Sequence, residues 1–124
     1  YSPIEQGVLT GKVTLDRKYA EDDERPARAW FQPGNLARVL AALEEVKPIA
    51  RDLGATLAQV CIAWVNAQPG VTASIVGART PEQVDENAGA GALRLSPDVV
   101  ARLTKIYESI GEPERKLVRS RVFK

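Results

Sequence analysis

Apolar residues recur at helical spacing in the first half of the chain. After Asn35, a residue suited to capping a helix, one face is expected to carry five apolar side chains. They are Leu36, Val39, Leu40, Leu43 and Val46. Proline lacks a backbone N–H and its ring clashes with the preceding turn, so Pro48 should kink or interrupt this helix. The apolar pattern then resumes through Leu53, and Gly54 supplies a helix stop.

Three further helices are predicted downstream, each with an apolar pattern behind a capping residue. Their expected ranges are 56–68, 81–90 and 96–111, and their caps are Thr56, Thr80 and Ser96. The first of them is apolar around most of its circumference, which indicates burial on two sides. Cys61 lies within it among apolar neighbours, so this single cysteine is expected to be a buried packing residue.

Two short apolar segments predict strands. Tyr1-Ser2-Pro3-Ile4 has the character of a strand end, and residues 71–76 are β-branched and bounded by Gly70 and Gly77. Strand, long helical connection, strand and helix is the order found in parallel βα units. Two parallel strands alone leave their edges and faces uncovered. The chain is therefore expected to be a fragment of a larger α/β fold, or to be completed by copies of itself.

The remaining long segment, residues 13–33, is charged and irregular and is expected to be a lid or a flexible surface loop. With 124 residues, 44% of them hydrophobic and 27% charged, the chain can form one compact domain over residues 1–111, followed by a basic tail over residues 112–124. Its 17 basic and 16 acidic residues leave a net charge of +1. Such a balance gives no global field that favours nucleic acid or an acidic membrane surface.

The scarcity of certain residue types excludes several kinds of site. The chain has no histidine and one cysteine, so we expect no metal cluster, no internal disulfide and no self-contained catalytic triad. No run approaches the ~18 apolar residues of a membrane span, and no charged-then-apolar signal segment opens the chain. A single cysteine fits a reducing compartment, so a cytoplasmic location is expected.

A strand that leads directly into a capped helix start, residues 75–87, is the strongest candidate for a binding site. Thr80 can cap the helix, Pro81 suits its first position, and Gln83 is placed to complete a capping box. Free backbone N–H groups and the helix dipole would face an anion there, and Arg79 adds a guanidinium suited to phosphate oxygens. An ordinary capped helix with a solvated arginine, or a site for a simple anion, would explain the same residues.

Three motifs, in order along the chain, resemble those of a known family. They are Tyr1-Ser2-Pro3-Ile4 with Gly7-Val8-Leu9-Thr10-Gly11-Lys12, the helix from Thr56-Leu57-Ala58-Gln59-Val60 to Ala63-Trp64, and residues 75–87. In these motifs the chain resembles the C-terminal part of an aldo-keto reductase. The resemblance implies the last two βα units and the C-terminal helix of a (β/α)8 TIM barrel. Since a complete barrel needs about 250 residues, half or more of it would lie outside this chain.

The resemblance also implies a binding site for NADPH. Tyr1 would stack on the nicotinamide ring, and the alternative is that it is an ordinary core aromatic. The residues that would line the pyrophosphate are Ser2, Ile4, Gln6, Leu9 and Gly11. The residues that would grip the adenosine 2′-phosphate are Gly77, Ala78, Arg79 and Thr80, and those facing this phosphate and the adenine are Gln83, Glu86 and Asn87.

Two departures from the family pattern focus the prediction on Arg79. Some members carry lysine at the position of Gly77 and arginine at that of Gln83, so Arg79 is the only strong cation of this motif. A charge-assisted pair with phosphate contributes about 1.5–3 kcal/mol, which implies more than a tenfold preference for NADPH over NADH. The family's catalytic aspartate, tyrosine, lysine and histidine come from the first four strands, so no catalytic residue is expected in this chain.

Two functions from different classes follow. In the first, the chain is part of an NADPH-dependent reductase of aldehydes or ketones and supplies cofactor binding, with residues 13–33 folding over the pyrophosphate. In the second, it is a non-catalytic helical module that self-associates or binds a partner through the exposed surface of the half-barrel. Neither function predicts a nucleic-acid or membrane partner.

Overall fold

The computed structural model describes residues 2–114, so Tyr1 and most of the predicted basic tail lie outside the described residues. Four α-helices dominate this part of the chain. They are α1 (Pro33–Asp52), α2 (Leu57–Asn66), α3 (Pro81–Gly89) and α4 (Pro97–Ser109). Short 3-10 helices accompany them as η1 (Glu5–Thr10), η2 (Arg25–Ala27), η3 (Ala29–Phe31) and η4 (Ala90–Ala92). The predicted mostly helical character is confirmed.

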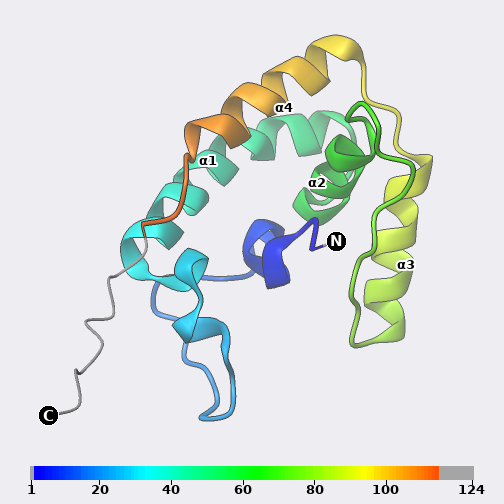
Figure 1. The fold of residues 1–124 in the computed structure, drawn as a ribbon. Coiled ribbons are helices and arrows are strands. Elements are labelled where there is room, and N and C mark those ends of the chain that lie inside the picture. Colours follow the sequence, from blue (N-terminus) through cyan, green and yellow to red (C-terminus); the bar gives the residue numbers. More distant parts are fainter. Residues whose placement is uncertain (1, 115–124) are drawn as a thin grey trace, which may run out of the picture.

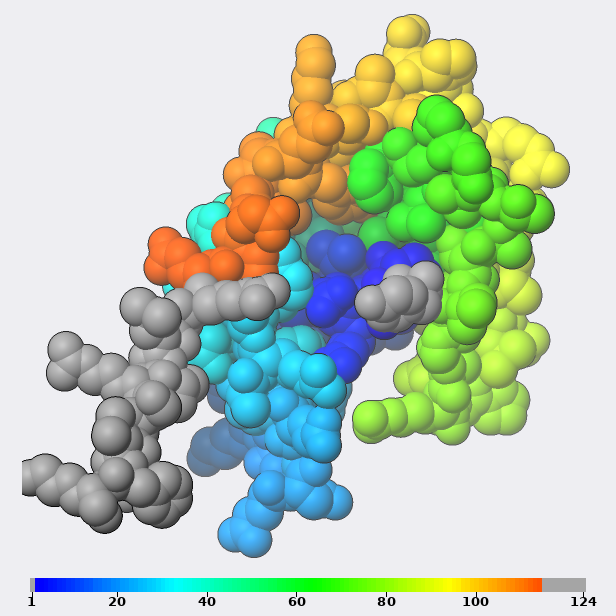
Figure 2. Space-filling model, viewed as in Figure 1, coloured from blue at the N-terminus to red at the C-terminus, as the bar shows by residue number. Residues whose placement is uncertain are grey.

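The helices form an arch around η1 (Figure 1). Helix α1 packs along α4, α2 packs against η1 and α3, and η1 also contacts α1. The core lies where α1, α2, α4 and η1 meet, and its most deeply buried members include Leu43, Leu103, Val8, Val39, Val46 and Val60. In the space-filling view, the face toward the reader is hollowed around the N-terminal residues (Figure 2). Cys61 is buried in this core region, as predicted.

Three of the predicted helix caps are confirmed. Thr56 Oγ1 accepts a hydrogen bond from the Gln59 backbone N–H, and the Gln59 side chain accepts one in return from the Thr56 N–H. At the start of α3, Thr80 Oγ1 accepts from the N–H of Gln83, and Ser96 caps α4 in the same way. Each cap satisfies a backbone donor that the first helical turn leaves unpaired.

Helix α1 corrects the prediction that Asn35 caps it. The helix begins at Pro33 with Gln32 at the cap position, and Asn35 lies inside the helix with only 3% of its surface exposed. Its amide nitrogen donates to the carbonyls of Ala29 and Glu114, at 2.8 and 2.9 Å. A buried amide needs such partners. Asn35 therefore does not cap a helix; it links α1 to η3 and to the segment after α4.

Pro48 does not interrupt α1, contrary to the sequence prediction. The helix runs unbroken from Pro33 to Asp52, with Val46 and Ile49 on either side of the proline buried in the core. Proline removes one backbone hydrogen bond within a helix. Apolar burial of the flanking residues holds the helix together across the missing bond, because tertiary packing contributes more to helix stability than local preference does.

The two predicted strands are wrong for the described residues. Ser2 and Pro3 lead directly into η1, and Ser2, Glu5 and Gln6 adopt left-handed backbone conformations with φ of 54°, 43° and 54°. Residues 71–78 form no strand, and Ile75 is 76% exposed. A strand requires a neighbouring strand for its backbone hydrogen bonds. Within residues 2–114 the two segments do not pair. Their side chains favour β structure, but no ladder of inter-strand hydrogen bonds forms there.

The predicted lid, residues 13–33, is partly ordered. It contains η2 and η3, and Val13 and Phe31 at its two ends are buried in the core. Tyr19 packs edge-on against Phe31, with ring centroids 6.1 Å apart. The segment is therefore fixed at its ends and in its middle. Among the described helices, none combines the length and the apolar character needed to cross a bilayer.

Candidate functional site

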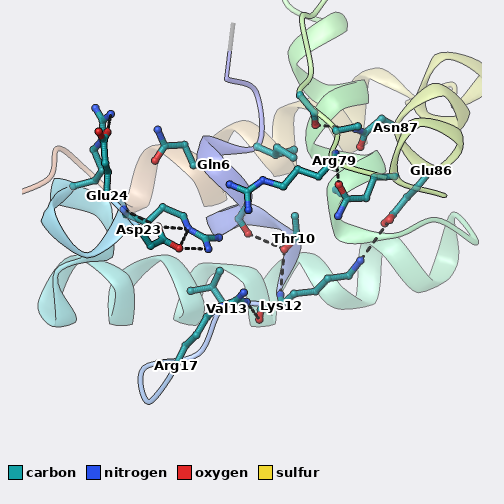
Figure 3. A pocket seen from close by; sticks show the side chains of 18 of the residues that line it. Gln6, Thr10, Lys12, Val13, Arg17, Asp23, Glu24, Arg79, Glu86 and Asn87 are labelled. Atoms are coloured by element: carbon teal, nitrogen blue, oxygen red, sulfur yellow. Dashed lines mark hydrogen bonds and ion pairs between the residues drawn. The ribbon is translucent and has the colours of Figure 1, made fainter. Parts of the chain in front are cut away.

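A cavity of about 900 Å3 lies between η1, the segment 12–28 and the turn that leads into α3 (Figure 3). It brings together eight of the residues predicted to bind the cofactor. They are Ile4, Gln6, Gly77, Ala78, Arg79, Gln83, Glu86 and Asn87. These residues come from two segments about 70 positions apart in the sequence, so the fold assembles one site from both predicted motifs.

Four other predicted residues do not line this cavity. Ser2 and Leu9 line a smaller recess on the other side of η1, and Thr80 lies on the outer side of the turn. Gly11 has a packing role: its φ is +73°, and a Cβ there would lie 2.6 Å from Leu57 Cδ1. The positive φ favours glycine at this position, and a Cβ would require the Leu57 side chain to shift. Tyr1 falls outside the described residues.

The turn that carries Arg79 is held by side chains of α3. The Arg79 backbone N–H donates to Gln83 Oε1 at 2.7 Å, and Asn87 Nδ2 donates to the Gly77 carbonyl at 3.3 Å. The capping box predicted for Gln83 is therefore corrected, because its side chain reaches the N–H of residue 79 and not that of Thr80. Held in this way, the turn directs the Arg79 side chain into the cavity (Figure 3).

Two backbone donors at the start of α3 already have partners, so the expected set of free N–H groups is smaller than the sequence indicated. Gln83 N–H donates to Thr80, and Val84 N–H donates to the Thr80 carbonyl. The first turn of α3 also carries an acidic residue, Glu82. Hydrogen bonds from its own backbone N–H and from Thr80 lower the pKa of Glu82, so its side chain is ionised at neutral pH. An anion in this cavity would therefore be held by side-chain cations and by little of the helix N-terminus.

The opposite wall carries a second arginine that is fixed by an aspartate. Arg25 Nε donates to Asp23 Oδ1 at 2.9 Å, and the Arg25 guanidinium lies over the Tyr19 ring, 5.0 Å from its centroid. Hydrogen bonds from Arg25 lower the pKa of Asp23 to about 2, and the charge of Arg79 contributes a smaller part in the same direction. The Asp23 carboxylate is thus the counter-ion of Arg25, and it lies close enough to Arg79 for that charge to influence its pKa.

Lys12 and Glu86 meet across one end of the cavity. Lys12 Nζ lies 3.5 Å from Glu86 Oε2, and this contact joins the end of η1 to α3. The Lys12 side chain is largely exposed, so the pair adds little stability on its own. It does place an ammonium group at the cavity edge (Figure 3).

The cavity is lined by five cationic and four anionic side chains. The cations are Lys12, Arg17, Arg25, Arg28 and Arg79, and the anions are Asp22, Asp23, Glu24 and Glu86. Sequence reasoning singled out Arg79 and Glu86 and missed the other seven. The available signal was the density of charges in residues 12–28, but which of them face the cavity depends on how that segment folds. Among the described residues, no group of three acidic or sulfur side chains is arranged to hold a metal ion.

The sequence pattern of the Aldo/keto reductase family matches residues 1–108. The chain belongs to the aldo/keto reductase family. The resemblance inferred from its three motifs is thereby confirmed, and both segments of the cavity lie inside the matched range.

Relatives of this aldo/keto reductase chain carry names of different kinds. An NADH-specific methylglyoxal reductase of Escherichia coli (strain K12) is 34% identical over 89% of the chain and 33% of its own length. Aldo-keto reductase str7 of Strobilurus tenacellus is 31% identical over 87% of the chain and 32% of its own length. A probable voltage-gated potassium channel subunit beta of Arabidopsis thaliana is 36% identical over 93% of the chain and 36% of its own length. The chain spans about a third of the length of these relatives.

Proposed function

We propose that this chain is the cofactor-binding part of an aldo/keto reductase that uses NADPH to reduce an aldehyde or ketone. The observation that carries the proposal is the position of Arg79, on a turn held by Gln83 and Asn87 and facing a cavity of about 900 Å3. Cavities of roughly 300–1,000 Å3 suit organic ligands and cofactors. The family match supports a nicotinamide cofactor as the occupant.

Within this proposal, each wall of the cavity has its own role. Arg79 would pair with the adenosine 2′-phosphate, because a guanidinium matches two phosphate oxygens and stays charged at every physiological pH. Lys12 would reach the phosphates from the other side, since it lies in the motif expected to follow the pyrophosphate. Glu86 and Asn87 would face the adenosine from α3. Tyr1 retains its expected role against the nicotinamide.

Residues 13–33 would cover the bound dinucleotide from the side of η2. The Asp23–Arg25 pair holds a turn within this segment, and Tyr19 packs against Phe31, which is buried in the core. Enclosure of this kind excludes water from a reacting centre. When bound, the nicotinamide supplies the hydride that reduces the carbonyl carbon; this chain would hold the dinucleotide, and the proton donor would come from residues outside the chain.

The preference for NADP is the sharper part of the proposal, because the E. coli relative is named as NADH-specific. Arg79 would discriminate, since a phosphate paired with a guanidinium is worth about 1.5–3 kcal/mol relative to an unpaired one. Titration of the chain with NADPH and with NADH, followed by the change in nicotinamide fluorescence, tests this. We expect Arg79→Ala to lower the affinity for NADPH by more than tenfold and to change that for NADH by less than twofold.

Arg102→Ala is the matched control. Arg102 is exposed on α4 and does not line the cavity, so this substitution removes the same charge outside the site. It should leave both affinities unchanged. Equal losses for NADPH and NADH in Arg79→Ala would remove the 2′-phosphate role of Arg79 and leave only a general cofactor contact. Absence of binding by the chain to either cofactor would contradict the proposed function of this chain.

A second candidate function is self-association or partner binding by the chain. The observation that favours it is the extended segment 71–78, in which Ile75 is 76% exposed, next to α3, in which Val84 is 54% exposed. Exposed apolar side chains beside an unpaired extended backbone invite another chain. One relative is named as a probable channel subunit, which is compatible with a partner-binding role. Light scattering tests this function, because self-association raises the mass of the chain in solution.

A further inference from the structure

Helix α3 places Glu86 and Asn87 on the wall of the cavity, yet none of its own residues is buried in the core (Figure 3). Ala90, directly after the helix, is buried, whereas Val84 in its middle is 54% exposed. The core therefore holds α3 mainly at its C-terminal end. Polar contacts along the helix should then decide where the rest of it lies relative to the cavity.

Gln59 of α2 makes such a contact with α3. Its Nε2 donates to the Glu86 carbonyl at 2.9 Å. This carbonyl belongs to the last turn of α3, where the N–H of Ala90 donates to the carbonyls of Asn87 and Ala88. The carbonyls of a last helical turn lack donors within their own helix. The Gln59 amide therefore supplies a donor that α3 does not provide.

Gly89 leaves the space that this contact needs. A Cβ at position 89 would lie 2.7 Å from Gln59 Nε2, so the amide would have to move away from the Glu86 carbonyl. The backbone of Gly89 is helical, with φ of −56°, and any residue could adopt it. The glycine is thus required for the close approach of the amide and not for the backbone conformation.

The other end of the Gln59 amide is fixed by α2 itself. Its Oε1 accepts from the Thr56 N–H at 3.0 Å and completes the capping box at the start of that helix. Ala58 and Val60, on either side of Gln59, are buried in the core, so the base of the side chain is also held in place. With its oxygen and its nitrogen both engaged, the amide joins a helix of the core to a helix at the surface.

We propose that Gln59 is a positioning residue for the adenosine end of the cofactor, because it holds α3 against α2 and so places Glu86 and Asn87 at the cavity. This inference rests on the proposed function, which takes adenosine as the ligand of that wall. Asn87, the residue after the anchored carbonyl, donates to the Gly77 carbonyl in the turn that carries Arg79. A shift of α3 would therefore move the adenosine wall and the support of this turn together.

Gln59→Glu separates the link to α3 from the cap of α2. A glutamate oxygen can still accept from the Thr56 N–H, as in many capping boxes, but an ionised carboxylate has no donor for the Glu86 carbonyl. We would titrate the 124-residue chain with 2′,5′-ADP by calorimetry. The affinity should fall about three- to tenfold, which is the range of one net neutral hydrogen bond, with little change in the urea midpoint.

Thr56→Ala is the matched control and should give the opposite result. It removes the hydroxyl that accepts from the Gln59 N–H, whereas the side-chain amide of Gln59 keeps both of its own partners. The urea midpoint should therefore fall while the affinity for 2′,5′-ADP is unchanged. A role of Gln59 in stability alone would not separate the two measurements in this way.

Gly89→Ala tests the same link without adding a charge. It should lower the affinity for 2′,5′-ADP about as much as Gln59→Glu does, because the new Cβ displaces the amide. Both substitutions act on one hydrogen bond, so the double variant should lose no more affinity than the weaker-binding single variant.

Hydrogen exchange of the α3 backbone amides, measured without ligand, reports on the link independently of any nucleotide. Exchange should be faster in Gln59→Glu and Gly89→Ala and unchanged in Thr56→Ala. Unchanged affinity in the first two variants would overturn the proposal, even if exchange were faster, because α3 would then be held without positioning the site. If the unmodified chain did not bind 2′,5′-ADP, the proposed function would be contradicted, and the exchange rates would still decide whether Gln59 holds α3.

Discussion

Asp23 stands between two arginines that have different roles in the proposed site. Arg25 is its hydrogen-bonded partner, whereas Arg79 acts on it only through its charge. This difference leaves the Arg79 guanidinium available for a phosphate, while Arg25 is engaged by Asp23 within its own segment. The two arginines therefore differ in how far a carboxylate already neutralises them, and the cavity as a whole carries charges of both signs.

The Asp23–Arg25 pair predicts a pH-dependent signal. Because the pKa of Asp23 is lowered to about 2 in the folded chain, the pair stabilises the fold above the ordinary pKa of about 3.8, and this contribution is lost as the pH falls toward 2. Arg25→Gln should raise the pKa of Asp23 toward 3.8, measured as the midpoint of its carboxyl carbon shift by NMR. Arg28→Gln serves as the control, since Arg28 pairs with Glu24. An unmoved midpoint in Arg25→Gln would show that the pair does not form in solution.

The turn before α3 depends on three local hydrogen bonds, from Gln83 to Thr80, from Arg79 to Gln83 and from Asn87 to Gly77. Thr80→Ala removes the acceptor of the Gln83 N–H, so we expect the free energy of unfolding to fall by about 1 kcal/mol. The affinity for NADPH should fall as well, because the turn that directs Arg79 loses its cap. Urea denaturation and fluorescence titration measure the two effects.

Thr80→Ser is the matched control for this element, because it retains the hydroxyl group. It should keep most of the stability and of the NADPH affinity. If Thr80→Ala matched the unmodified chain in both measurements, the cap would not be what positions Arg79.

Local signals explain which elements could be predicted from sequence. The caps at Thr56, Thr80 and Ser96 were predictable because cap and partner lie three residues apart. The strands were not, because a strand is completed by residues distant in sequence, and within residues 2–114 the segment 71–78 has no strand beside it. Asn35 misled the prediction in a similar way, since its partners include the distant Glu114 carbonyl.

The candidate site shows the same division between local and distant information. Arg79, Gln83 and Asn87 belong to one contiguous motif, so the sequence indicated them together. Asp23 and Arg25 lie in a segment with no regular pattern, and their position over the cavity follows from the anchoring of Tyr19 and Phe31. No local pattern encodes such an approach.

As a whole, the molecule presents an arch of helices with an extended segment left unpaired. The chain spans about a third of the length of its relatives, and a (β/α)8 barrel buries its parallel strands beneath a ring of helices. Residues 71–78 occupy the place between α2 and α3 where such a strand is expected, and they lack a neighbour among the described residues. Because no strand covers this segment, the apolar side chain of Ile75 is exposed to solvent.

This exposed segment predicts that the 124-residue chain associates with itself. Its weight-average mass in multi-angle light scattering should rise with concentration, and Ile75→Asp should reduce the rise by placing a charge in the apolar contact. Leu15→Asp is the control, because Leu15 is also an exposed apolar residue but lies in the segment that covers the cavity. A constant monomer mass at all concentrations would contradict this expectation.

We propose above all that the cavity beside α3 binds the 2′-phosphate of NADP through Arg79. The most direct test uses only the adenosine end of the cofactor, by calorimetric titration of the chain with 2′,5′-ADP and with 5′-AMP, which differ by that phosphate alone. We predict that 2′,5′-ADP binds at least tenfold more tightly and that Arg79→Ala removes the difference. Equal affinity for the two nucleotides, or a preference that survives in Arg79→Ala, would contradict the claim.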